Sequence, residues 1–154
     1  TPEYLARIEL FVYAKAVEEI EWRLRRLEGR LAGLTVRSAY LYEDIPAMLS
    51  GKDVGLVPSV WWDNGPQTVM EYMACGLPVI GAELGGIPDI VKHGHNGLLF
   101  RGNDRFDFAR TLVGITNNPN MLLDLRRNVC PPRSIPQHTS QMEALYEQCL
   151  AGRA

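Results

Sequence analysis

Two acidic residues, Asp63 and Glu71, flank a short stretch whose residues suit the binding of a phosphorylated ligand. Pro66 is predicted to open a helix between them, at the first helical position, where a missing N–H costs nothing. The first N–H groups of a helix have no partner within it and carry the positive end of its dipole. The free N–H groups of residues 67–69 are therefore expected to bind an anion such as a diphosphate.

The spacing of the two acids indicates what else the ligand carries. Glu71 lies three residues beyond Thr68 on the same helix face, about 5 Å along the axis. A carboxylate at that distance can accept two hydrogen bonds from the hydroxyls of a ribose next to the diphosphate. Asp63 lies on the loop before the helix, on the other side of the phosphate position. The order ribose, diphosphate, sugar is that of a nucleotide-sugar.

The elements around these residues are predicted from hydrophobic runs and turn signals. Val54–Val57 is a short apolar run that stops at Pro58 and Ser59, as a buried parallel strand does. The helix after it is expected to stop at Gly76, with Pro78 two residues on. Its start then lies where a parallel strand ends, which is where open α/β sheets bind ligands.

The rest of the chain alternates between strand and helix patterns. Strands are expected over 8–13, 34–39, 78–80 and 98–100, and helices over 17–31, 45–49, 106–115, 121–129 and 137–150, with another opening at 85–88. Such alternation predicts an α/β fold with a doubly wound parallel sheet. The first of these strands is expected to be buried.

Composition excludes several classes of protein. The 154 residues are enough for one domain with a sizeable core, and 46% apolar and 22% charged residues are ordinary for a globular protein. A net charge of −2 argues against a nucleic-acid-binding face. No apolar run reaches the roughly 18 residues that a membrane span needs. Cys75, Cys130 and Cys149 make an odd count without metal-like spacing, which favours reduced thiols.

The central residues also resemble a known family. Asp63 and Glu71 form an acidic pair separated by seven residues and followed by YMACGLPVIGAELGGIPDIVKHGHNGLLF. This pattern is similar to the donor-binding signature of retaining GT-B glycosyltransferases, specifically those of family 4. The resemblance extends from about Ile8 to Tyr146. Asp63 stands where that family usually has a glutamate, one methylene longer.

The resemblance implies a fold, an activity and a set of roles. The fold would be Rossmann-like and correspond to most of the C-terminal domain of such an enzyme. The activity would be transfer of a sugar from a nucleotide diphosphate to an acceptor with retention of configuration. Asp63 would contact the transferred sugar as the catalytic-site residue, and Glu71 would bind the ribose. Donor binding is assigned to Tyr40, Asn64, Gly65, Pro66, Gln67, Thr68, Val69 and Glu71.

The resemblance also sets expectations about cofactors and partners. No Asp-x-Asp occurs, so neither a metal nor a cofactor is expected, and the nucleotide-sugar is a substrate. Residues 1–154 are expected to be a single donor-binding domain without its first strand–helix unit and without the N-terminal acceptor domain. The acceptor, a sugar, lipid or other small molecule, would bind through that second domain. The isolated fragment is expected to be inactive and able to dimerise over its sheet edge. The full-length protein is expected in the cytoplasm, free or associated with a membrane.

Two other functional classes compete with this interpretation. A non-catalytic nucleotide-sugar binding or scaffold domain would keep the same residues without turnover. A dinucleotide oxidoreductase would need Gly-x-Gly-x-x-Gly after the first strand, and Val12 to Ala16 lack it. Isomerases that share the GT-B fold fit less well because their signature differs around the acidic pair. The nucleotide base, the sugar and the acceptor stay open.

Three further features each allow two interpretations. Tyr40 and Tyr42 leave an expected strand beside the proposed site, where they either pack against the protein or stack on a base. Gly85 and Gly86 either let backbone approach a ligand or make a tight turn. His93 and His95 stand two residues apart with only His138 elsewhere, which is a poor ligand set for a metal.

Overall fold

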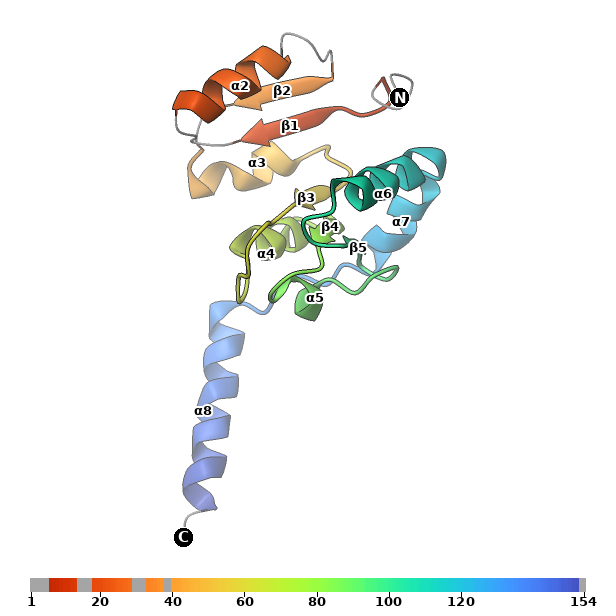
Figure 1. Cartoon of the computed structure of the whole chain (residues 1–154). Helices are drawn as coiled ribbons and strands as arrows, with labels where there is room; N and C mark the ends of the chain where they lie inside the picture. The colour runs from red at the N-terminus through yellow and green to blue at the C-terminus, as the bar shows by residue number, and fades with distance from the viewer. Residues whose placement is uncertain (1–5, 14–17, 29–32, 38–39, 153–154) are drawn as a thin grey trace.

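The computed structural model describes residues 6–13, 18–28, 33–37 and 40–152. Strands and helices alternate along these residues, as the sequence predicts (Figure 1). In chain order they are β1 (Leu10–Tyr13), α2 (Glu18–Glu28), β2 (Leu34–Arg37), the 3₁₀ turn η1 (Tyr42–Asp44), α3 (Ile45–Leu49), β3 (Gly55–Val57), α4 (Gln67–Ala74), β4 (Val79–Ala82), α5 (Ile87–Ile90), β5 (Gly97–Phe100), α6 (Arg105–Asn117), α7 (Asn120–Arg127) and α8 (Ile135–Ala151).

The strands pair in parallel, which confirms the predicted α/β class. They form two hydrogen-bonded sheets, β1–β2 and β3–β4–β5. In the larger sheet Leu56 pairs with Ile80, and Ile80 with Leu98. In Figure 1, α4 lies on one side of this sheet and α6 and α7 lie on the other. This arrangement of helices on both faces of parallel strands is Rossmann-like.

The two sheets are joined through side chains among the described residues rather than through a strand ladder. The Lys52 ammonium lies 3.7 Å from the centre of the Phe11 ring of β1. Arg7 donates to the backbone oxygen of Thr116 at the end of α6. The β1–β2 unit therefore contacts elements that surround the larger sheet, since Lys52 precedes β3 and Thr116 lies in α6.

The core of the domain lies around β4, the central strand of the larger sheet. Val79 and Ile80 of β4 are completely buried, as is Val69 of α4. Ile87 of α5 is 1% exposed. The prediction of a buried first strand is wrong, because β1 belongs to a two-stranded sheet in which Leu10 is 38% exposed and burial is concentrated on β2.

Helix α4 ends where the sequence predicts. Gly76 has φ +73°, the left-handed conformation that glycine adopts without strain. The N–H of Gly76 donates to the Met73 oxygen at 3.0 Å, and that of Leu77 donates to the Tyr72 oxygen at 2.9 Å. These two bonds form a Schellman cap, which satisfies the last carbonyl groups of the helix.

The last helix, α8, extends away from the rest of the fold (Figure 1). Ser134 and Gln137 close a capping box at its start, as the Ser134 N–H donates to Gln137 Oε1 at 2.9 Å. None of its residues is buried, and Tyr146 is 61% exposed. Among the described residues, none of the helices is both long and apolar enough to cross a membrane.

Candidate functional site

The candidate site lies at the carboxyl edge of the larger sheet. Because β3, β4 and β5 run parallel, the loops that follow them all start at this edge. The loop after β3 carries Asp63 and leads into α4, the loop after β4 carries Gly85 and Gly86, and the loop after β5 leads into α6.

The start of α4 differs in two details from the sequence prediction. Pro66 is the residue before the helix rather than its first residue, because its ψ of 117° is extended. The N–H of Val69 is not free, because the first turn closes tightly and this group donates to the Pro66 oxygen at 3.1 Å. The N–H groups of Gln67 and Thr68 have no acceptor among the described residues. Two donors, not three, are therefore available to an anion here.

Asp63 is half-buried in the loop before this helix. Its Oδ1 accepts a hydrogen bond from the Gly65 N–H at 3.1 Å, which is the local bond of an Asx turn. Its Oδ2 has no hydrogen bond to a described residue. One carboxylate oxygen thus shapes the loop, and the other is available to a ligand.

The loop after β4 touches the Asp63 loop directly. The Gly86 N–H donates to the backbone oxygen of Asp63 at 2.7 Å. A Cβ atom placed on Gly85 would lie 2.2 Å from that same oxygen, and one on Gly86 would lie 2.0 Å from the oxygen of Asn64. Real Cβ atoms essentially never come within 3.0 Å of a non-bonded atom beyond their own residue and its chain neighbours. The two glycines therefore serve a close approach of two backbones.

Glu71 is half-buried on α4, next to Tyr72 in the chain. Burial raises the pKa of Tyr72, and electrostatic interactions with Tyr40 and with Glu71 raise this pKa further. Tyr40 follows β2 and stands edge-on to Tyr13 at the end of β1, with ring centres 6.3 Å apart. Tyr40 and Glu71, predicted to act on the same ligand, thus both lie within electrostatic reach of the Tyr72 phenol.

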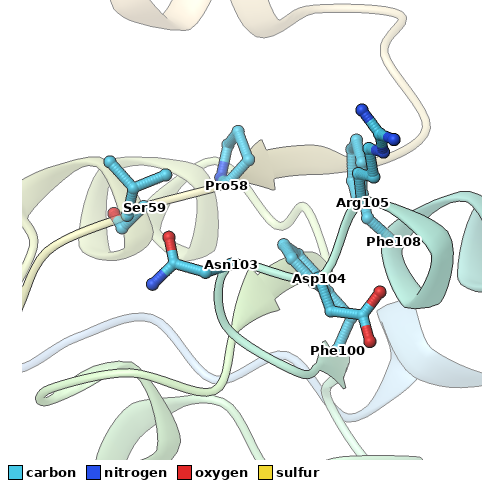
Figure 2. A pocket seen from close by; sticks show the side chains of 8 residues that line it. Pro58, Ser59, Phe100, Asn103, Asp104, Arg105 and Phe108 are labelled. Carbon is cyan, nitrogen blue, oxygen red and sulfur yellow. The ribbon is translucent and has the colours of Figure 1, made fainter.

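An open hollow of about 240 Å³ lies beside the Asp63 loop, between the loops that follow β3 and β5. Figure 2 shows Pro58 and Ser59 on one side of it and Arg105 and Phe108 of α6 on the other. Its lining consists of Pro58, Ser59, Val60, Phe100, Asn103, Asp104, Arg105 and Phe108. The hollow includes neither Asp63 nor Glu71, so it adjoins the predicted site without containing it.

The start of α6 contrasts with the start of α4. Asp104 Oδ1 accepts hydrogen bonds from the N–H groups of Phe106, at 2.9 Å, and Asp107, at 3.0 Å. This helix start is therefore already occupied by a carboxylate. The Arg101 N–H and the Arg110 guanidinium, which donate to the Asp107 carboxylate, lower its pKa. Among the described residues, the start of α4 leaves two N–H groups without an acceptor, those of Gln67 and Thr68, whereas the start of α6 leaves only that of Arg105.

Two parts of this edge are not predicted from the sequence. One is the hollow, because Gly102 and Asn103 in the loop beside it indicate only a turn; Asn103 has φ +61°. The other is Tyr72, although this residue adjoins Glu71. The Gly85–Gly86 turn was identified, and its partner is the Asp63 loop.

His93 has a structural partner. Its Nδ1 accepts a hydrogen bond from the Leu99 N–H at 3.0 Å. Within the described parts of the chain, no group of three or more His, Cys, Asp or Glu side chains is placed to hold a metal ion.

Comparison with known proteins identifies the family. The sequence model of the family described as "Glycosyl transferases group 1" matches residues 2–118. The chain belongs to this family. Its fold is α/β with parallel strands, and its structural neighbours are GT-B glycosyltransferases.

Two relatives illustrate the similarity in sequence. The chain is 45% identical over 103 residues to a D-inositol 3-phosphate glycosyltransferase of Streptomyces bingchenggensis, which covers 65% of this chain and 22% of the relative. It is 35% identical over 75 residues to a UDP-Gal:alpha-D-GlcNAc-diphosphoundecaprenol alpha-1,3-galactosyltransferase of Escherichia coli, covering 49% of this chain and 19% of the relative. The matched region thus spans about a fifth of the length of these relatives.

Two solved structures illustrate the similarity in fold. A sucrose-phosphate synthase of Thermosynechococcus elongatus superposes with a TM-score of 0.74 at 22% identity, covering 98% of this chain and 41% of that one. Anabaena Alr3699/HepE in complex with UDP-glucose superposes with a TM-score of 0.68 at 20% identity, covering 83% of this chain and 37% of that one.

Proposed function

We propose that this chain is the donor-binding domain of a retaining glycosyltransferase of family 4, which uses a nucleotide diphosphate sugar. The observation that carries the proposal is the start of α4. The N–H groups of Gln67 and Thr68, which find no acceptor in the described part of the chain, stand at the carboxyl edge of the sheet between Asp63 and Glu71. Membership of the glycosyl transferases group 1 family supports the same assignment.

Each group then has a role in the transfer. Negative charge builds on the diphosphate as its bond to the sugar breaks, and the N–H groups of Gln67 and Thr68 stabilise that charge at no cost in reorganisation. Glu71 binds the ribose hydroxyls. Asp63 holds the transferred sugar through the carboxylate oxygen that its own loop does not use. Asn64, Gly65, Pro66, Val69 and Tyr40 complete the donor site.

The wider assignments follow from the same proposal. Residues 1–154 form one donor-binding domain, and the acceptor binds through a second domain. The acceptor is a sugar, lipid or other small molecule; two relatives are named for D-inositol 3-phosphate and for a diphosphoundecaprenol-linked sugar. The reaction needs neither a metal nor a cofactor. The enzyme works in the cytoplasm, free or at a membrane surface.

A thermal-shift panel tests donor binding. The chain is melted with UDP, GDP, ADP and their sugars, and with NAD as the control. A ligand at about 100 times its dissociation constant adds roughly 2.7 kcal/mol of stability. For a domain of this size that corresponds to roughly 5–10 °C in Tm. A response to one nucleoside diphosphate and its sugar is expected, whereas a response to NAD alone contradicts the proposal.

The alternative is a nucleotide-sugar binding or scaffold domain without turnover. It shares every residue of the donor site, so binding data do not separate the two functions. An assay of nucleoside diphosphate release does, carried out with the chain alone and with the chain joined to its acceptor domain. Release only in the joined protein supports the enzyme, and binding without release in both supports the scaffold.

A further inference from the structure

The loop after β4 and the loop after β3 meet backbone to backbone, with no space between them. The Gly86 N–H donates to the Asp63 oxygen at 2.7 Å. A Cβ on Gly85 would lie 2.2 Å from that oxygen and 2.7 Å from the Asp63 nitrogen. Gly85 also has φ +56°, a conformation that favours glycine. At Gly85, which faces Asp63, both the close contact and the positive φ therefore exclude a side chain.

The glycine turn is itself fixed to the sheet. The Glu83 N–H donates to the Phe100 oxygen of β5 at 2.7 Å. The Leu84 side chain covers Gly102, where an added Cβ would meet its Cγ at 2.4 Å. On the other side of the turn, Ile87 is 1% exposed in the core. The loops that follow β3, β4 and β5 therefore form a stack, and the buried strands set the position of this stack.

This stack leaves Asp63 little freedom. Its backbone is held by the Gly85–Gly86 turn, and its Oδ1 is held by the Gly65 N–H. With the backbone and one carboxylate oxygen fixed, the direction of the free Oδ2 is also fixed. Groups that hold a reacting ligand need this kind of support, because a displacement of about 0.5 Å already weakens them.

We propose that Gly85 and Gly86 are positioning residues for Asp63, which set the place and direction from which its carboxylate meets the sugar of the donor. They act through the Asp63 backbone and touch neither the sugar nor the diphosphate. The role of Asp63 toward the sugar rests on the proposed function. The positioning itself rests on the backbone contacts alone.

The test compares two ligands that differ only in the sugar. Dissociation constants for UDP and UDP-glucose are measured by calorimetry for the wild-type chain, Gly85→Ala and Gly86→Ala. Each variant is expected to bind UDP with a dissociation constant within about threefold of wild type. Its dissociation constant for UDP-glucose is expected to rise about tenfold, which is the effect of losing one hydrogen bond to a charged group. An equal loss for both ligands overturns the proposal, because it would place the turn at the diphosphate or in general stability.

Gly94→Ala is the matched control. Gly94 has φ +75°, close to that of Gly85, but an added Cβ there meets no atom within 4 Å. It therefore carries the same backbone strain without a contact to Asp63. It is expected to keep the affinities of wild type for both ligands.

Asp63→Ala separates a failure of this inference from a failure of the proposed function. If Asp63→Ala still binds UDP-glucose more tightly than UDP, the proposed contact of Asp63 with the sugar is wrong. If Asp63→Ala loses this preference and both glycine variants keep it, the proposed positioning role of Gly85 and Gly86 is wrong.

Amide hydrogen exchange tests the positioning without any ligand. In the wild-type chain the Gly86 amide is expected to be protected from exchange as strongly as the Ile80 amide in β4, because the hydrogen bonds of both amides break only when the core opens. The Gly65 amide, bonded to Asp63 Oδ1, is expected to lose protection in Gly85→Ala and to keep it in Gly94→Ala. Rapid exchange of Gly86 in the wild-type chain overturns the proposal, and this measurement needs no variant to fold.

Discussion

The ring of Tyr72 lies over Gly55 and occupies the position that a side chain on Gly55 would need. A Cβ on Gly55 would lie 2.2 Å from Cδ2 and 2.4 Å from Cγ of that ring. Gly55 is buried in β3, and the atoms in the way include Cγ, which lies next to the Tyr72 backbone, so either α4 must shift or Tyr72 must change its side-chain conformation. Gly55→Ala is therefore expected to destabilise the fold by about 1–3 kcal/mol, the usual cost of overpacking a core. Urea unfolding measures this change.

A double variant identifies the cause. Tyr72→Ala removes the ring together with its Cγ and Cδ2, so Gly55→Ala is expected to cost less than half as much stability in the Tyr72→Ala background as in the wild type. Gly114→Ala is the control, because its Cβ meets no atom within 4 Å in α6 and alanine is the better helix former. If Gly55→Ala lowers the free energy of unfolding equally in the wild type and in the Tyr72→Ala background, Tyr72 is not the residue that excludes a side chain from position 55.

Glu71→Ala is expected to weaken nucleotide binding sharply and to leave the fold intact. The loss of hydrogen bonds to a charged group costs roughly 1.5–3 kcal/mol, which is about tenfold or more in affinity. Calorimetry with the nucleoside diphosphate that shifts the melting temperature measures it. Glu143→Ala, on the exposed face of α8, is the control for loss of one negative charge. Equal affinity in wild type and Glu71→Ala would contradict the ribose contact.

Glu28 links α2 to β2 in a manner that depends on pH. Its Oε1 accepts from the Val36 N–H at 2.7 Å, and its Oε2 accepts from Arg25 at 3.3 Å. The Val36 hydrogen bond is the main cause that lowers the Glu28 pKa. Because the folded-state pKa lies below the unfolded value, the carboxylate stabilises the fold above the unfolded pKa and this contribution is lost as pH falls through the folded pKa.

Glu28→Gln is therefore expected to be less stable than wild type near neutral pH and to match it in acid. Urea unfolding of both proteins between about pH 7 and about pH 3.5 follows this difference across the range where glutamates titrate. Arg23→Gln, which breaks an exposed ion pair on the same helix, is the comparison. A difference between Glu28→Gln and wild type that stays constant with pH would argue against the charged hydrogen bond.

Removal of α8 is expected to change the stability of the remaining fold very little. Hydrophobic stabilisation depends on apolar area taken out of water, and no residue of this helix is buried. Chains that end after residue 130 and after residue 152 are compared by thermal unfolding. A substantially lower melting temperature of the shorter chain would show that α8 packs on the domain in solution.

Much of the site could be predicted because its signals are local. The positions of β3 and α4 follow from an apolar run bounded by proline, serine and glycine, and the structure has both elements there. The end of α4 at Gly76 was predicted from glycine followed by proline, and its cap is formed by bonds within five residues. The first turn of α4 was less predictable. Whether the Val69 N–H stays free depends on the ψ angle of Pro66, which the residue type alone does not determine.

The sequence by itself determined the alternation of strands and helices, the acidic pair at Asp63 and Glu71, and the family. All of these follow from residue types at short spacing, because hydrogen bonding and hydrophobic periodicity act along neighbouring residues. Only the tertiary structure decided that the strands form two sheets, that Tyr72 fills the space over Gly55, and that Gly85 and Gly86 press against the Asp63 loop. The contact of Tyr72 with Gly55 joins residues 17 positions apart through the packing of α4 on β3. The contacts of Gly85 and Gly86 with the Asp63 loop join residues 22 or 23 positions apart, because parallel strands bring the loops that follow them to one edge of the sheet.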